Sequence, residues 1–408
     1  MTEQKLTKAR DLRDSRPLWI DSPRITVRST SHVSIDHYDI VIVGAGISGA
    51  LVAQALVKPG KSILIIDKRT PVHGSSIAST AMIQHEIDVP LHKLQTMIGE
   101  EQANRAWLRS AKAVLKLEDI VRSLEISCSM LRRQALYVAG DEMGARGLKI
   151  EMEARVKAGI GAQFIDKAGM KKLYAIERSG AILSDISASA NPGQLTAGLL
   201  RHAARHGAEI VSGVEITDIK AFKERVFLGT AAGKLISAGH VVFCTGYEFL
   251  QSLANKKHEI ISTWAIASKA GVALPHWLKN HILWEASDPY LYLRTDNQGR
   301  LIAGGEDENN ASAYHSEAKL HKKEKTIQRK VSKLLGVDIG PVEYRWAAAF
   351  GSTTTGLPLI GPVPDLQNVY CVMGFGGNGI TFSQIAAEII STAINGARDP
   401  DAELFALK

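Results

Sequence analysis

The chain has 408 residues, which is too long for a single compact core, so we expect two domains or lobes. Charged residues make up 22% and hydrophobic residues 45% of the sequence, a composition that excludes a disordered chain and argues against a protein with many membrane spans. The formal net charge of +7 is accompanied by no DNA-binding or RNA-binding motif, so we expect no nucleic-acid partner and no transmembrane segment.

Residues 1–37 are polar, contain Pro17 and Pro23, and show no sustained hydrophobic period. We expect them to form an extended N-terminal arm on the surface, without the apolar stretch of a secretory signal. The three cysteines lie far apart without CxxC spacing, so we expect neither a disulfide framework nor a metal site. A cytoplasmic location fits this cysteine usage.

The next expected element is a βαβ unit between residues 38 and 67. The run DIVIV predicts a buried strand, GAGISG a turn, ALVAQALVKPGK a helix that ends at Pro59-Gly60, and SILIID a second strand. A membrane-spanning helix is the other interpretation of this apolar stretch, but it would not explain the three glycines of GAGISG. In a dinucleotide site Gly44 makes the turn, Gly46 lets a pyrophosphate approach the backbone, and Gly49 allows the helix to pack on the strand. The sequence therefore predicts a bound dinucleotide.

Three later segments favour FAD over NAD. GSSIASTAMI, residues 74–83, is rich in small hydroxylated side chains, and HVVFCTGY, residues 240–247, predicts a strand that returns to the same ligand. From Asn368, NVYCVMGFGGNGITF predicts a strand, a glycine-rich turn and a helix. The N-terminus of that helix would stabilise negative charge on a reduced flavin. An NAD-dependent dehydrogenase remains the alternative.

These segments, together with ANPGQLTAGLLRHAARHGAEI, YLYLRTDNQGRLIAGGE and TGLPLIGPVP, occur in the order found in a known family. From about Tyr38 to the C-terminus the chain resembles the D-amino-acid oxidase, glycine oxidase and sarcosine oxidase family of FAD-dependent oxidoreductases. The resemblance implies an α/β fold with a Rossmann-like FAD-binding domain built from the discontinuous segments 38–90, 185–255 and 340–408. Residues 91–184 and 256–339 would form a second, α+β substrate-binding domain with a mostly antiparallel sheet.

The resemblance also implies the residues that hold the cofactor. The glycines of GAGISG would bind pyrophosphate, Asp67 the ribose, the 74–83 segment the phosphates and flavin edge, Val214 the adenine, and the segment after Phe375 the pyrimidine end. The full set comprises Gly44, Gly46, Ile47, Ser48, Gly49, Asp67, Lys68, Arg69, Ser75, Ser76, Ala78, Ser79, Thr80, Ala81, Met82, Val214, Thr245, Gly246, Gly376, Gly377, Asn378, Gly379, Ile380 and Thr381. The cysteine that binds flavin covalently in sarcosine oxidases has no counterpart, so non-covalent FAD is expected.

The implied reaction is oxidation of an amine or amino acid by hydride transfer to flavin N5, followed by hydrolysis of the imine. The electron acceptor would be oxygen, a quinone or a carrier protein, and an oligomer is possible. A flavin-bearing subunit without catalytic activity is the alternative from another functional class.

The substrate site departs from the family pattern. Phe350 stands where amino-acid oxidases carry an arginine that binds the substrate carboxylate, so plain glycine or sarcosine is not expected. Strand alternation places Tyr290, Tyr292 and Arg294 on one face, where Arg294 could bind substrate, and Trp346 and Phe350 could form the opposite wall. The alternative for the first three is ordinary sheet packing. His85, which follows the flavin-edge segment, is either a site residue or a structural histidine.

Overall fold

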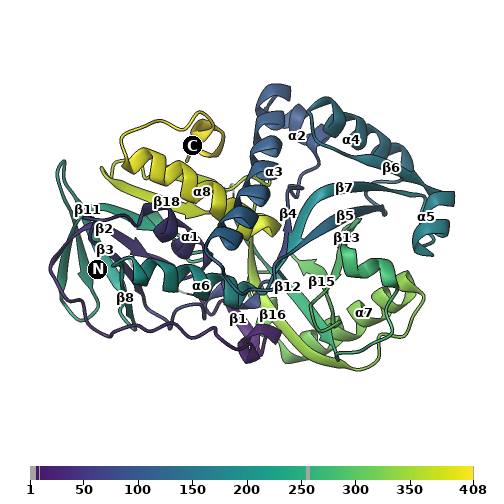
Figure 1. The fold of residues 1–408 in the computed structure, drawn as a ribbon, viewed down its shortest axis with the longest axis horizontal. Coiled ribbons are helices and arrows are strands. Elements are labelled where there is room, and N and C mark those ends of the chain that lie inside the picture. Colours follow the sequence, from purple (N-terminus) through teal and green to yellow (C-terminus); the bar gives the residue numbers. More distant parts are fainter. Residues whose placement is uncertain (1–5, 9, 254–257, 408) are drawn as a thin grey trace.

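A computed structural model describes residues 6–8, 10–253 and 258–407. Two β-sheets lie at opposite ends of the long axis of the molecule (Figure 1). The mixed α/β architecture agrees with the fold class expected from the sequence. Short 3-10 helices connect the larger elements at Leu18–Asp21, Ser75–Ala78, Gln251–Leu253, His276–Asn280, Ala313–His315, Gly376–Asn378 and Ala402–Phe405.

The eight-stranded sheet contains the predicted βαβ unit. Its central strands run parallel in the order β18 (Val369–Met373), β11 (Leu235–Phe243), β2 (His37–Val43), β3 (Ile63–Asp67) and β8 (Glu209–Ser212). Antiparallel strands β17 (Leu359–Pro362), β9 (Ile216–Ala221) and β10 (Val226–Thr230) extend it. The unbroken aliphatic runs of β2 and β3 are buried, as parallel strands covered on both faces require.

Three helices accompany this sheet. Helix α1 (Ile47–Leu56) packs against both α6 (Pro192–Arg205) and α8 (Gly379–Ile394). Most of the side chains of α1 and α8 are buried, which explains why both helices are apolar around most of their circumference.

The ten-stranded sheet is antiparallel except where β13 runs parallel to β5. Its strands are β1 (Arg13–Ser15), β16 (Val342–Thr353), β12 (His258–Ser268), β15 (Leu301–Glu308), β14 (Leu291–Thr295), β13 (His281–Ala286), β5 (Leu131–Ala139), β7 (Gly180–Ser189), β4 (Met82–Gln84) and β6 (Gln163–Asp166). The accompanying helices are α2 (Leu91–Ile98), α3 (Glu100–Ser123), α4 (Ala145–Lys157), α5 (Lys167–Tyr174) and α7 (Glu317–Leu335). Helix α7 packs its apolar stripe on β12, β15 and β16. Of its lysines, Lys322, Lys325 and Lys333 are exposed, whereas Lys323 lies over the Trp264 ring and pairs with Glu308 of β15.

The strands of the two sheets do not follow the expected division of the chain into segments. Strand β16 begins after residue 340, in a segment expected to bind FAD, yet it pairs with β12 along its whole length. Strand β4 lies before residue 90 and pairs with β7 of the same ten-stranded sheet. Both strands therefore connect the two halves of the molecule, and the division into two domains stays a prediction.

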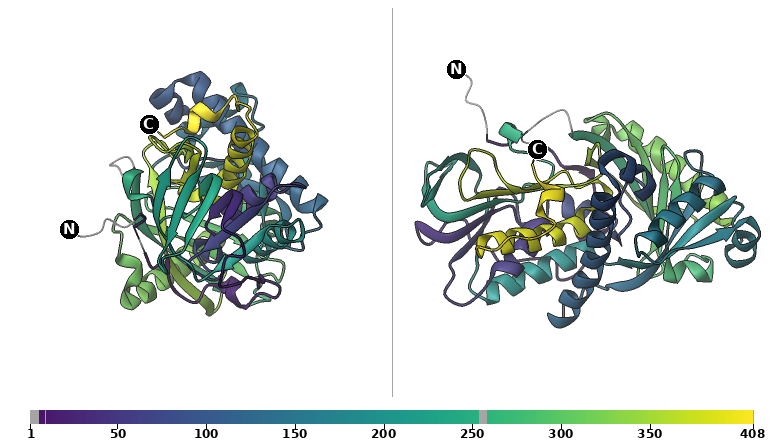
Figure 2. Two further views of the ribbon diagram at one scale, coloured as in Figure 1. Left: turned by 90° about the vertical axis from the view of Figure 1, so that its left-hand side faces the viewer. Right: turned by 90° about the horizontal axis from the view of Figure 1, so that it is seen from above.

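The N-terminal segment is anchored to both sheets, which the expectation of an extended arm on the surface did not include. Lys8 N donates to Phe249 O, β1 pairs with β16, and Thr30 forms a bridge with Val211 of β8. The purple segment in Figures 1 and 2 accordingly leads from one sheet to the other. The segment itself contributes buried apolar side chains that follow no period: Leu12, Leu18, Trp19, Ile25, Val27 and Val33. An extended chain that packs irregularly leaves no periodic pattern in the sequence.

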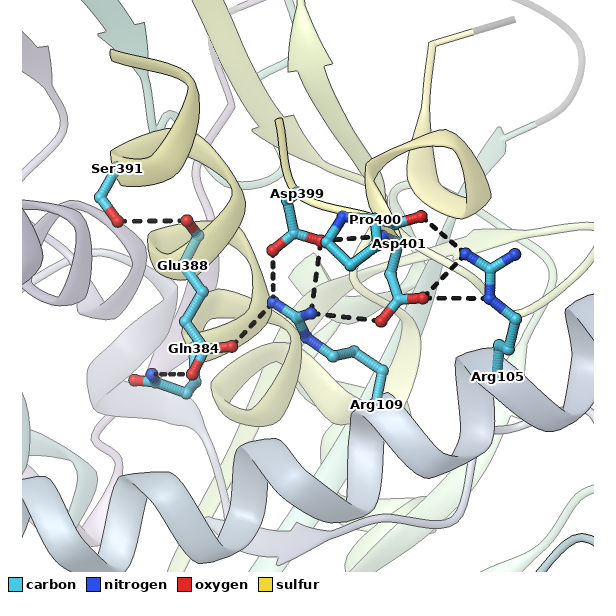
Figure 3. Close-up of polar contacts among 8 residues, drawn as sticks. All are labelled: Arg105, Arg109, Gln384, Glu388, Ser391, Asp399, Pro400 and Asp401. Carbon is cyan, nitrogen blue, oxygen red and sulfur yellow. Dashed lines mark hydrogen bonds and ion pairs between the residues drawn. The ribbon is translucent and has the colours of Figure 1, made fainter. Parts of the chain in front are cut away.

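The C-terminal segment is fixed to α3 by a cluster of ion pairs (Figure 3). Arg109 on α3 contacts Glu388 of α8 and Asp399 at 2.8 Å each, and Asp401 at 3.2 Å. Arg105, one turn earlier, contacts Asp401 at 3.0 Å. The side chains of Arg109 and Asp399 are only 12% and 7% exposed, so this network is better shielded than ordinary surface pairs. It connects α3 to α8, whose N-terminus borders the site.

Candidate active site

A single cavity of about 530 Å³ runs between the two sheets. It begins at the carboxyl ends of β2, β3 and β11 and continues to β14, β15 and β16. The ends of parallel strands are the usual place for a ligand in an open α/β sheet.

Each of the three glycines of GAGISG is required for a different structural reason. A Cβ on Gly44 would lie 2.3 Å from Cys244 O, and one on Gly49 would lie 1.9 Å from Gly44 O, so both positions exclude any side chain. A Cβ on Gly46 would meet only Ser76 Oγ, at 3.0 Å. Gly44 and Gly49 therefore allow close packing of strand and helix, whereas Gly46 keeps the helix N-terminus open to the cavity.

The start of α1 is suited to a diphosphate. Gly46 is its N-cap and offers no side-chain hydrogen bond to the free backbone N–H groups. Ser76 Oγ accepts from Ile47 N at 2.9 Å, and Ser75 Oγ lines the cavity, is buried and has no hydrogen-bond partner. An unpaired hydroxyl beside an uncapped helix N-terminus provides the donors that an anionic phosphate requires.

The end of the cavity where adenosine is expected, called the adenosine end below, is lined by charged residues that pair with one another. Asp67 accepts from the backbone N–H groups of Ala45 at 2.7 Å and Arg69 at 2.8 Å, and burial raises the pKa of Asp67. Lys68 and Arg69 both bind Glu248, at 2.8 and 2.6 Å. Each carboxylate oxygen of Asp67 keeps a second lone pair, which a ribose hydroxyl could occupy.

The N-terminus of α8 opens into the same cavity. The turn of residues 376–380 lines it, and Ser48 of α1 is hydrogen-bonded to Ser383 of α8 at 2.8 Å between the two Oγ atoms. Gly377 N donates to Asp88 Oδ2 at 2.8 Å. The two helix starts expected to meet one ligand are therefore brought together.

Most of the predicted cofactor residues line the cavity. They are Gly44, Gly46, Ile47, Ser48, Asp67, Lys68, Arg69, Ser75, Ser76, Ala78, Ser79, Thr80, Met82, Val214, Thr245, Gly246, Gly376, Gly377, Asn378, Gly379 and Ile380. Gly49, Ala81 and Thr381 do not line it. Gly49 is packed against Gly44, Ala81 is buried, and Thr381 Oγ1 donates to Gln84 O at 3.0 Å, so their contribution is to hold the surrounding backbone.

Of the predicted substrate residues, Tyr290, Tyr292 and Phe350 line the cavity and Arg294 does not. The Arg294 side chain is buried away from it. Its guanidinium donates to Thr80 O at 2.7 Å, Ala190 O at 2.8 Å and Thr295 O at 3.2 Å, and it lies over the Trp19 ring. The prediction that Arg294 binds a substrate carboxylate is wrong, because its donors already bind carbonyl groups from three segments.

We expect an Arg294→Leu substitution to lower stability by about 2–4 kcal/mol, because three carbonyl groups in or near the core would lose a donor and only Thr295 O would keep another described one, from Arg133. Urea unfolding of the FAD-loaded protein would measure the loss. Arg132→Leu, which removes an exposed ion pair with Glu118, is the control and should cost less than about 1 kcal/mol. Unchanged stability of the Arg294 variant with a raised KM would instead restore the substrate role.

His85 and Trp346 also lie outside the cavity, which corrects both site assignments. His85 is fully buried, packs edge-on against Trp107, and its Nδ1 contacts Ile186 O at 2.8 Å. Burial lowers the pKa of His85, which keeps it neutral. Trp346 Nε1 donates to Ala78 O at 2.8 Å, so this ring supports the flavin-edge segment from behind.

The residue that sequence analysis missed is Asp307. It lines the cavity together with Asp88, Tyr247 and Thr263. Strand β15 has one extra residue opposite β12 between Gly305 and Glu308, and Gly305 and Glu306 both have positive φ angles of 121° and 59°. Such a bulge changes the direction of the side chains that follow it. The Gly-Gly pair before Glu306 was the signal in the sequence that could have revealed it.

The substrate end of the cavity holds two carboxyl groups with raised pKa values. Burial raises the pKa of Asp307 to about 6, although the Thr263 and Tyr290 hydroxyls favour its ionised form. Asp88 faces the open cavity but is surrounded by protein, and this burial raises its pKa to about 6 despite the hydrogen bond from Gly377. Burial also raises the pKa of Tyr290 and Tyr292, so both phenols stay protonated.

The raised pKa of Asp307 predicts a dependence of stability on pH. An unfolded aspartate has its ordinary pKa of 3.8, whereas the pKa of folded Asp307 is about 6. Ionisation of Asp307 therefore does not affect stability below pH 3.8 and lowers the free energy of unfolding as pH rises through 6. We expect Asp307→Asn to raise stability at pH 8 by about 1–3 kcal/mol and to have little effect at pH 4. Thermal unfolding at both pH values would measure this. Glu308→Gln, which removes a partner of Lys319, should slightly lower stability at pH 8.

The described residues also show whether a helix could span a membrane and whether side chains could hold a metal ion. Within the described ranges, no helix combines the length and the apolar character needed to cross a membrane. The same ranges contain no group of three or more His, Cys, Asp or Glu side chains that could hold a metal ion.

The sequence and the fold are similar to those of known proteins. The sequence model of the family described as FAD dependent oxidoreductase (DAO) matches residues 39–393. Gamma-glutamylputrescine oxidoreductase of Escherichia coli is 21% identical, over 90% of this chain and 85% of its own length. Glycine oxidase of Bacillus licheniformis is also 21% identical, over 88% of this chain and 93% of its own. The crystal structure of glycine oxidase from Geobacillus kaustophilus superimposes with a TM-score of 0.76 at 20% identity, covering 92% of this chain and 99% of that chain.

Proposed function

Because the chain belongs to the DAO family of FAD-dependent oxidoreductases, we propose that it binds FAD non-covalently in the cavity and oxidises a carbon–nitrogen bond of a small amine or amino acid. The observation that carries this proposal is the continuity of the cavity. It joins an uncapped helix N-terminus beside Asp67 to a chamber that contains Tyr290, Tyr292 and Phe350. A cofactor that extends from one end to the other would present its reactive ring to that chamber.

The side chains support a non-covalent cofactor. Among the described lining residues there is no histidine, and Cys244 is the sole cysteine. Burial raises the pKa of the Cys244 thiol, so it stays protonated and unreactive. We expect acid precipitation to release the flavin entirely into the supernatant.

When bound, FAD would accept a hydride from the carbon that carries the nitrogen, and water would hydrolyse the resulting iminium to a carbonyl compound and an amine or ammonium ion. The residues of the chain would orient the reacting bond and exclude water. The aromatic rings of Tyr290, Tyr292 and Phe350 shield the chamber. Its ionised carboxylates can take a proton from the substrate nitrogen, which must be neutral to lose the hydride.

The test is anaerobic titration of the purified yellow holoprotein with amines and amino acids while the flavin absorbance is followed. The panel includes glycine and gamma-glutamylputrescine, which appear in the names of the relatives. Bleaching by any member supports the proposal, and re-oxidation by air or by a quinone then identifies the acceptor. A colourless protein that binds NAD would favour a dehydrogenase. A yellow protein that no member bleaches would favour a non-catalytic flavin subunit.

A further inference from the structure

The charges of the cavity are distributed unevenly between its two ends. Of the described lining residues at the substrate end, five are acidic and one, Lys93, is basic. The acidic ones are Asp88, Glu142, Glu285, Asp288 and Asp307. The other two basic residues of the described lining, Lys68 and Arg69, lie at the adenosine end, where Asp67, Glu215 and Glu248 balance their charges.

Most of these acidic side chains form no ion pair with another described residue, although the positive charge of Lys323 acts on Asp307 from a longer distance. Glu285 is the exception, since Arg178 contacts it at 2.5 Å. Both carboxylate oxygens of Asp307 are buried and neither accepts a hydrogen bond of good geometry. A buried charge without a partner is costly, which is why such groups mark places where a ligand completes the pairing.

The acidic residues occupy two parts of the chamber. Asp307 lies beside Tyr290 and Thr263, and Asp88 contacts the start of α8 through Gly377 N. Glu142 and Asp288 are exposed, and Glu142 N donates to Ala286 O at 3.0 Å, in the short segment that joins Trp284 to Asp288. The Trp284 ring stacks on Tyr137 at 3.9 Å, and both rings line the cavity. Aromatic rings between acidic groups suit an alkyl chain with a cationic end.

We propose that the substrate is an aliphatic diamine or polyamine cation, bound at its reacting end by Asp307 and at its distal ammonium by Glu142 and Asp288. This inference rests on the proposed function and specifies its substrate class. A substrate carboxylate would be repelled by Asp88 and Asp307, and among the described residues of the chamber the exposed Lys93 is the only cation that could pair with it. The proton of the reacting ammonium passes to Asp307. The C–H electron pair and its hydrogen then pass to FAD, which leaves an iminium cation for hydrolysis.

The experiment compares three compounds of similar length with the holoenzyme: 1,4-diaminobutane, butylamine and 4-aminobutanoate. We expect kcat/KM for the diamine to exceed that for butylamine by about tenfold, because butylamine lacks the distal ammonium. It should exceed that for 4-aminobutanoate by about a hundredfold, because the acidic residues also repel the distal carboxylate. Glu142→Gln should lower kcat/KM for the diamine more than for butylamine. Lys93→Gln separates the rival interpretation, because it would impair 4-aminobutanoate selectively if a carboxylate bound there.

A binding measurement separates this inference from the proposed function. Tetramethylammonium has no nitrogen lone pair and cannot be oxidised to an imine, so calorimetric titration of it into holoenzyme reports cation recognition alone. We expect Asp307→Asn to weaken this binding by about tenfold and the matched neighbour variant Glu308→Gln to leave it unchanged.

The outcomes are distinct. Equal binding by wild type and Asp307→Asn, or a preference for 4-aminobutanoate that Lys93→Gln abolishes, would overturn the inference. Asp307-dependent binding of the cation without bleaching by any amine would support the cation site and remove the proposed function.

Discussion

Replacing Arg155 with leucine is expected to lower the free energy of unfolding by about 3–5 kcal/mol, because the change leaves two buried carboxylates without their counter-charge. Arg155 Nε lies 2.8 Å from Glu151 Oε1 and its Nη1 lies 2.9 Å from Glu86 Oε1, and all three side chains are 0% exposed. Burial alone would raise the pKa of Glu151, but Arg155 holds it at about 2. Chemical denaturation of wild type and variant at pH 7 would measure the difference.

The pH dependence of this loss follows from the same pKa. Since the pKa of Glu151 is lowered from 4.5 to about 2, the ion pair stabilises the fold above pH 4.5 and loses its effect as pH falls toward 2. The deficit of the Arg155 variant should therefore shrink in acid. Arg122→Leu, which removes an exposed pair with Asp119, is the control and should change stability by less than about 1 kcal/mol. If both variants lost a similar amount of stability, the buried network would contribute no more than an exposed ion pair.

The Arg155 network also reaches the site. Asn378, the N-cap of α8, donates to Glu86 O, and Asp88 accepts from Gly377 N. The segment that carries Glu86 and Asp88 is therefore fixed on one side by Arg155 and on the other by the start of α8. We expect the Arg155 variant to bind FAD more weakly as a second consequence of losing this support.

The cofactor half of the site could be predicted because its signals are local. The spacing of Gly44, Gly46 and Gly49 and the acid at Asp67 lie within one βαβ unit. The close packing of Gly49 on Gly44 and the hydrogen bond from Ala45 N to Asp67 are contacts inside that unit, although Gly44 also packs on Cys244 and Gly46 faces Ser76. The second helix start could be predicted from its glycine-rich turn. The expectation that the two would meet one ligand rested on the dipole of the second helix and on the resemblance to a family.

The substrate half could not be predicted from alternation along one strand. Arg294 is turned into the protein by carbonyl groups from Thr80 and Ala190, which are distant in sequence and leave no mark near it. Asp307 faces the cavity only because a bulge interrupts β15. The anchoring of the N-terminal segment could not be predicted for a related reason. Its buried residues contact several elements in turn, so no period reports their burial.

Replacing Gly46 with aspartate is expected to abolish most FAD binding while the protein stays folded. Aspartate is a favourable N-cap residue, Gly46 has an ordinary φ of −88°, and a Cβ there meets only Ser76 Oγ. A carboxylate at this place would repel a diphosphate and fill the space it needs. We expect the Kd for FAD to rise about a hundredfold or more, which corresponds to about 3 kcal/mol. Flavin fluorescence during titration of the apoprotein would measure it.

Gly144 provides a matched control for this substitution. It is the N-cap of α4 with φ of −84° and ψ of −173°, close to the −88° and −170° of Gly46, and a Cβ there meets nothing within 4 Å. Gly144→Asp should therefore leave FAD affinity unchanged, and any stability change should be small and favourable. If Gly46→Asp bound FAD as tightly as the control, the diphosphate could not lie at the start of α1. The cofactor would then have to be placed elsewhere in the cavity.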